Sequence, residues 1–158
     1  MSRAASTTST TIPDSVVNEA ARAADPVADP LTGQRILIVE DDPFITLALE
    51  EMLGEQGLVI AGTAHNLQKA IDLASRATLD VALLDVNIGP EKIDPVADIL
   101  AARGCPFVFT TGCGRAGLPE AYLDRPIVEK PFYIEEILNT LRDELVAATA
   151  RDAAAARG

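Results

Sequence analysis

Short, wholly apolar runs alternate along the chain with segments in which apolar residues recur at every third or fourth position. The clearest runs cover residues 36–39, 81–84 and 107–109, and weaker ones cover 58–61 and 127–128. Runs of four to eight apolar residues are typical of strands that are buried on both faces, as in a parallel sheet. The pattern therefore predicts five strands.

The segments between these runs have helical periodicity. Ile45, Leu49 and Leu53 share one helical face, and a last apolar stripe begins after Tyr133. Residues suited to helix ends stand at the expected places: Asp42, Asn66 and Asp94 as starts, and Gly57 and Gly104 as stops. Five strands that alternate with helices predict an α/β fold of three layers, with a parallel sheet covered on both faces.

Composition divides the chain into a domain and two tails. Residues 1–33 are rich in hydroxyl side chains, alanine and proline, so we expect a flexible N-terminal tail. Residues 34–149 hold the alternating pattern and form the domain. Residues 150–158 are mostly alanine with scattered charge, and we expect them to be disordered.

Charge and cysteine content exclude several classes of protein. Thirteen Lys and Arg against 24 Asp and Glu give a net charge of −11, which disfavours nucleic acid and anionic membrane surfaces. The longest stretch free of charged residues has 13 residues, which is too short for membrane insertion. The N-terminus lacks a secretory signal, so we expect a cytoplasmic protein in which Cys105 and Cys113 are packing residues with free thiols.

Polar residues follow the predicted strands directly. Glu40 and Asp41 follow the first strand, and Asp85 ends the third. Ligands of such sheets lie beyond the carboxyl ends of the strands, where neighbouring carboxylates would need a cation such as Mg²⁺. Thr111 and Lys130 end the fourth and fifth strands, and they could hold a phosphoryl group beside a nucleophilic carboxylate.

Four segments together resemble the receiver domain of two-component response regulators: residues 36–42, 81–87, 106–112 and 127–132. They follow one another in the order found in that family. The resemblance implies a flavodoxin-like fold with strand order 2-1-3-4-5. It also implies a stand-alone phosphoacceptor that signals in a phosphorelay and is not an enzyme, apart from its own phosphotransfer and autodephosphorylation.

The resemblance also assigns roles to residues. Asp85 would accept the phosphoryl group from a phosphohistidine on a sensor histidine kinase or phosphotransfer protein. Mg²⁺ would be bound by Asp85, Asp41, the backbone carbonyl of Asn87 and, through a water, Glu40. Lys130, followed by a cis bond to Pro131, and the hydroxyl of Thr111 would contact the phosphoryl group. We expect the output to be contact with an unidentified downstream protein, because the 28 residues after Lys130 are too few for a DNA-binding unit, although the protein could equally act as a phosphate sink or relay.

Two features depart from the family pattern. Ile127 stands where the family often has an aromatic residue that turns inward on activation, so the usual coupling between that residue and the threonine is in question. Gly114, Gly117 and Pro119 interrupt the segment after the fourth strand, and they predict a short or irregular fourth helix.

Three alternative functions compete with this interpretation. A metal-dependent phosphohydrolase that forms an aspartyl phosphate usually has a second aspartate two positions after the nucleophile, but Asn87 stands there. A receiver-like binding module without phosphorylation would not need all the acidic, threonine and lysine positions. The glycines of residues 112–117 match a dinucleotide fingerprint, but no long helix is expected to follow them.

Overall fold

In the computed structural model, which describes residues 29–157, the five predicted strands form one parallel sheet. The strands are β1 (Arg35–Val39), β2 (Val59–Ala64), β3 (Val81–Asp85), β6 (Phe107–Thr111) and β7 (Ile127–Glu129). Their spatial order is β2-β1-β3-β6-β7, which confirms the predicted order 2-1-3-4-5 and the flavodoxin-like fold. The reversal of strand order between β1 and β3 creates the crevice in which this fold binds ligands.

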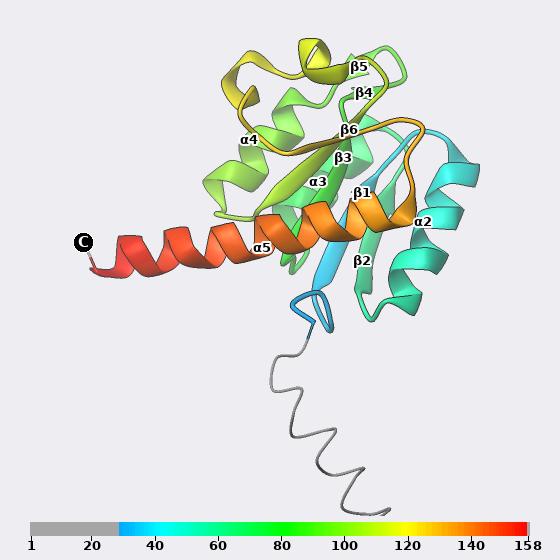
Figure 1. The fold of residues 1–158 in the computed structure, drawn as a ribbon. Coiled ribbons are helices and arrows are strands. Elements are labelled where there is room, and N and C mark those ends of the chain that lie inside the picture. Colours follow the sequence, from blue (N-terminus) through cyan, green and yellow to red (C-terminus); the bar gives the residue numbers. More distant parts are fainter. Residues whose placement is uncertain (1–28, 158) are drawn as a thin grey trace, which may run out of the picture.

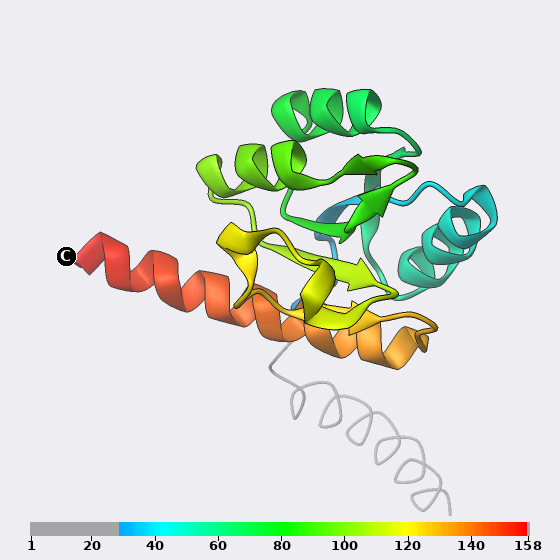
Figure 2. The same ribbon diagram turned by 90° about the horizontal axis from the view of Figure 1, so that it is seen from above.

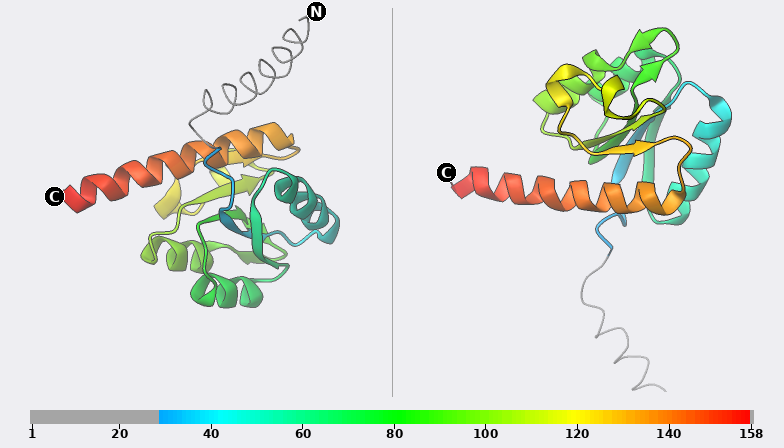
Figure 3. Two further views of the ribbon diagram at one scale, coloured as in Figure 1. Left: turned by 90° about the horizontal axis from the view of Figure 1, so that it is seen from below. Right: turned by 45° about the horizontal axis from the view of Figure 1, so that its top comes forward.

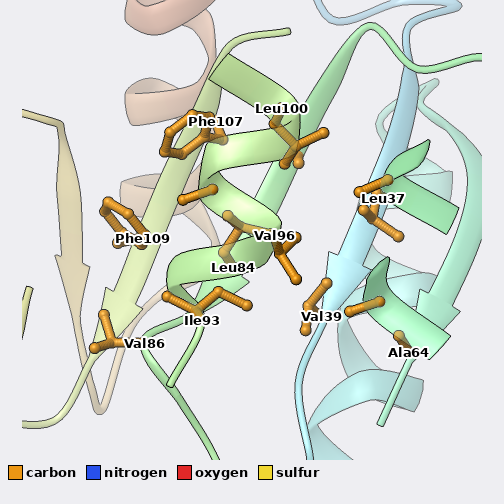
Figure 4. Packing of buried hydrophobic residues seen from close by; sticks show 14 of the residues in the cluster. Leu37, Val39, Ala64, Leu84, Val86, Ile93, Val96, Leu100, Phe107 and Phe109 are labelled. Carbon is orange, nitrogen blue, oxygen red and sulfur yellow. The ribbon is translucent and has the colours of Figure 1, made fainter. Parts of the chain in front are cut away.

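Four α-helices of the described region cover both faces of the sheet (Figures 1 and 2). They are α2 (Pro43–Glu55), α3 (Leu67–Arg76), α4 (Asp94–Ala102) and α5 (Ile134–Arg157). Alternate residues of each strand point to opposite faces, so the apolar runs supply two cores at once. Leu37 and Leu84 pack with α3 and α4, as Figure 4 shows, whereas Ile38 packs with α2 and α5.

The predicted helix starts are right at two of three positions. Asp42 Oδ1 accepts a hydrogen bond from the backbone N–H of Phe44, and Asn66 Oδ1 accepts one from Lys69. Asp94 was expected to cap α4 but is its first residue, and the capping position belongs to Ile93. The Ile93 side chain is fully buried, so core packing fixes this helix start without a side-chain cap.

Both ends of the domain extend further than expected. Residues 1–28 of the predicted tail lie outside the described residues, but Leu31 is fully buried in the core between the sheet and helices α2 and α5. Helix α5 continues to Arg157, although disorder was expected from residue 150 (Figure 3). Alanine has the highest helix propensity, so an alanine-rich end prolongs a helix that is already nucleated.

The segment between β6 and β7 contains two 3₁₀ turns, Gly114–Gly117 and Glu120–Tyr122, in place of an α-helix. This agrees with the irregular fourth helix expected from its glycines. One side chain differs from its expected packing, since Cys113 is exposed. No helix of the described region is long and apolar enough to cross a membrane.

Candidate functional site

Three carboxylates meet at the carboxyl end of the sheet. Because β1 and β3 are neighbours, with Val39 opposite Leu84, Glu40 and Asp41 come close to Asp85. Ligand oxygens from these three residues all lie within 4.8 Å of one another. Hard oxygen donors at this spacing suit Mg²⁺, which commonly uses one or two carboxylates and keeps several waters.

Lys130 forms ion pairs with two of the three carboxylates. Its Nζ donates to Glu40 Oε1 at 2.9 Å and to Asp85 Oδ2 at 2.8 Å. The lysine follows β7 and precedes a cis bond to Pro131, as the resemblance implied. Its backbone N–H also donates to the carbonyl of Thr111 at 2.8 Å, so the end of β6 fixes the position of Lys130.

Burial and hydrogen bonds together shift the pKa values of two members of this cluster, Glu40 and Lys130. Glu40 is only 2% exposed, and loss of hydration raises the pKa of its carboxyl although Lys130 and the Asp42 backbone oppose the shift. Burial alone would lower the pKa of Lys130, but its hydrogen bonds to Asp85 and Glu40 raise it above the ordinary value. The lysine is therefore a fixed positive charge beside the carboxylates.

The turn after β1 is held by two residues that were not predicted to belong to the site. The buried hydroxyl of Thr46 donates to the backbone carbonyls of Glu40, at 3.2 Å, and Asp42, at 3.0 Å. His65, in the loop after β2, has its Nδ1 3.0 Å from the same Glu40 carbonyl. No sequence pattern distinguishes such residues, because their role depends on which loops the fold brings together.

A small hairpin beyond the end of β3 completes the rim of the site (Figure 1). It consists of β4 (Asn87–Ile88) and β5 (Glu91–Lys92). The backbone N–H of Asn87 donates to Asp85 Oδ1 at 3.2 Å, and that of Gly89 donates to Asp41 Oδ2 at 2.8 Å. The apolar pattern of the sequence does not predict this hairpin, although the Gly89-Pro90 dipeptide is a turn signal.

Thr111 is oriented toward the following loop. Its Oγ1 accepts a hydrogen bond from the N–H of Cys113 at 3.0 Å and lies 3.4 Å from the Gly114 carbonyl. The structure therefore brings Glu40, Asp41, Asp85 and Lys130 into direct contact or close approach. The backbone N–H of Asn87 contacts Asp85, and the backbone carbonyl of Thr111 contacts the N–H of Lys130.

An unpredicted aromatic residue packs against the core from the segment between β6 and β7. The Tyr122 ring meets Phe107 edge-on, with centroids 5.5 Å apart, and its hydroxyl donates to Asp98 at 2.6 Å. Ile127, at the position often aromatic in the family, is half-buried and packs against the same core. The aromatic side chain of this region thus comes from the irregular segment and not from β7.

Comparisons with known proteins agree on one family. The family model described as "Response regulator receiver domain" matches residues 36–142. Transcriptional regulatory protein PdtaR of Mycobacterium tuberculosis is 32% identical over 136 residues, which cover 83% of this chain and 65% of that protein. Phyllosphere-induced regulator PhyR of Methylorubrum extorquens is 32% identical over 126 residues, covering 74% of this chain and 44% of the relative.

Solved structures give the same result. The solution structure of SdrG from Sphingomonas melonis has a TM-score of 0.61 and 37% identity, covering 77% of this chain and 99% of SdrG. The response regulator PhyR from Brucella abortus has a TM-score of 0.66 and 26% identity, covering 79% of this chain and 53% of PhyR. This chain therefore spans under two thirds of PdtaR and of both PhyR proteins, but nearly the whole of SdrG.

Proposed function

Because the chain belongs to the response regulator receiver domain family, we propose that it accepts a phosphoryl group on Asp85 from a phosphohistidine of a sensor histidine kinase or phosphotransfer protein. The observation that carries the proposal is the set of contacts made by the Asp85 carboxylate. One oxygen accepts from Lys130 and the other from the Asn87 backbone, while Glu40 and Asp41 lie beside it. This is a carboxylate fixed in place next to groups suited to phosphate and metal.

The proposed transfer is a displacement at phosphorus. An oxygen of Asp85 forms the new P–O bond as the P–N bond to the donor imidazole breaks, and the imidazole nitrogen keeps the electron pair. Mg²⁺ would be held by Asp85, Asp41 and the carbonyl of Asn87, with Glu40 acting through a water. When bound, the ion neutralises charge on the phosphoryl oxygens.

Lys130 would also contact the phosphoryl group after the transfer. In the described structure its ammonium is shared between Glu40 and Asp85. Once Asp85 carries a phosphoryl group, the same ammonium can pair with a phosphoryl oxygen. The fixed positive charge of Lys130 thus stabilises the acyl phosphate without moving far from its position.

The proposed output passes through the loop that follows β6. If the Thr111 hydroxyl turns to a phosphoryl oxygen, the Cys113 N–H loses its acceptor, and the 3₁₀ turn at Gly114–Gly117 loses a contact at its start. The change would alter a surface that binds a downstream protein. The charge of −11 disfavours nucleic acid as that target. We also propose a cytoplasmic location, in line with the free thiols of Cys105 and Cys113.

The proposal is tested by labelling with acetyl phosphate and Mg²⁺. We expect intact-protein mass spectrometry to show one added phosphoryl group, which is lost on hydroxylamine treatment and absent from Asp85→Asn. Asp72→Asn, an exposed position on α3, removes the same charge remote from the site and should label as the parent protein does. An unlabelled parent protein would instead support the receiver-like binding module, and sustained turnover of small phosphate esters would support the phosphohydrolase.

A further inference from the structure

The hairpin of β4 and β5 places a second ammonium group at the mouth of the site. Asn87 and Lys92 face each other across the two antiparallel strands. Lys92 Nζ donates to Asn87 Oδ1 at 3.2 Å, and both side chains are exposed. Since Asn87 also donates its backbone N–H to Asp85, a chain of two hydrogen bonds connects Lys92 to the phosphoacceptor residue.

The charges around this rim are mostly negative. Glu40, Asp41 and Asp85 form the carboxylate cluster, and the exposed Glu91 precedes Lys92 in β5. Lys130 is already engaged by two of the carboxylates. A phosphodonor carries negative charge itself, so it approaches a site whose own carboxylates oppose it.

We propose that Lys92 is a specificity-determining residue that attracts anionic phosphodonors to Asp85, an inference that rests on the proposed function. Its exposed ammonium is not engaged by a carboxylate in the described region, because its hydrogen bond goes to the neutral amide of Asn87. That amide keeps the ammonium on the rim and leaves its charge uncompensated. Lys92 takes no part in bond formation and acts by electrostatic attraction and positioning.

Contacts between the hairpin and the rest of the domain fix the backbone position of Lys92. The N–H of Gly89 donates to Asp41 at 2.8 Å, so the turn between the two strands is attached to the carboxylate cluster. Ile88 is buried in the core, which anchors β4 from below. These contacts fix the backbone from which Lys92 projects, and so reduce the entropy lost when a donor is held.

An electrostatic role predicts opposite effects on two ligands. Removing the ammonium should weaken the approach of an anionic donor but strengthen the binding of Mg²⁺, which the same positive charge repels. A merely structural role would predict that both become weaker, because a distorted hairpin would misplace the Asn87 backbone. The sign of the Mg²⁺ effect therefore separates the two roles.

The test compares Lys92→Gln, Lys92→Arg and the matched control Lys69→Gln, which removes a lysine from the exposed face of α3. The phosphorylation rate is measured at subsaturating acetyl phosphate with saturating Mg²⁺. In that reaction the bond between phosphorus and the acetyl oxygen breaks, acetate leaves with the electron pair, and Asp85 forms the new P–O bond. Mg²⁺ affinity is measured separately by calorimetry.

We expect Lys92→Gln to lower the rate roughly 3- to 10-fold at low ionic strength, with less effect in high salt, and to tighten Mg²⁺ binding. Lys92→Arg should keep most of the parent rate, and Lys69→Gln should match the parent. A rate for Lys92→Gln equal to that of Lys69→Gln, or weaker Mg²⁺ binding, would overturn the inference and leave the proposed function intact. Failure of the parent protein to label would overturn the proposed function and, with it, the role given to Lys92.

Discussion

Replacing Lys130 with methionine would test how strongly this ammonium holds the carboxylates together. The change keeps the apolar stem but leaves Glu40 and Asp85, with side chains 3% and 8% exposed, without their shared cation. Breaking a buried ion pair costs about 3–5 kcal/mol. The Lys130 side chain is 25% exposed, so solvent screens part of this loss and we expect roughly 2–3 kcal/mol without metal.

The assay is urea denaturation of Lys130→Met in EDTA, with Lys69→Met as the matched control. Adding Mg²⁺ should recover part of the lost free energy of unfolding, because an ion that binds only the folded form stabilises it and supplies positive charge in place of the ammonium. The phosphoacceptor carboxylate itself remains, so the two measurements concern only its electrostatic surroundings.

The pH dependence supplies a second check on Lys130→Met. Burial already raises the pKa of Glu40 above its ordinary value of 4.5, and loss of Lys130 removes a contact that lowers it. A carboxyl whose folded pKa is raised binds more protons in the folded state, so stability falls as pH rises from about 4.5 through the folded pKa. The loss of unfolding free energy in Lys130→Met should therefore be larger at neutral pH than near pH 4.5, the ordinary pKa of a glutamate. An equal deficit at both, or none beyond the control, would refute the reasoning.

Three further predictions concern the rest of the fold. Leu31→Ala should lower the free energy of unfolding by about 2–5 kcal/mol in chemical denaturation, because the side chain is fully buried in the core between the sheet and helices α2 and α5. Burial and the hydrogen bond to Asp98 raise the pKa of Tyr122 to about 12, so absorbance titration of a Tyr133→Phe variant should show ionisation only near that pH. The free energy of unfolding of this variant should fall between about pH 10 and pH 12, because the unfolded chain loses the tyrosine proton first. A thiol reagent should modify exposed Cys113 first, because burial raises the pKa of Cys105 to about 11.

The sheet could be predicted from the sequence because its strands are buried on both faces. Residues 81–85 are all buried, and an apolar run of this kind has few other places in a small α/β domain. The meeting of Asp41 and Asp85 also follows from the sequence, but only once β1 and β3 are taken as neighbours. That adjacency came from the family resemblance and is borne out by the pairing of the two strands.

The features that the sequence did not predict depend on contacts between distant segments. The hairpin of β4 and β5 has only two residues in each strand, and its exposed residues show no periodicity. Thr46 is an ordinary helix residue until the turn after β1 comes within reach of its hydroxyl. Tyr122 stands in a segment with turn-forming neighbours, and only the packing of that segment on Phe107 buries its ring.

The contacts of Tyr122 also bear on how a signal could leave the site. Where the family often has an aromatic residue on the last strand, this chain has the half-buried Ile127, which offers no ring to turn inward. Tyr122 is held by Phe107 and by Asp98 of α4, while Thr111 holds the start of the same segment through Cys113. A movement of Thr111 would release one end of a segment whose other end stays fixed. Such a segment can change its surface near Cys113 without any rearrangement of the core.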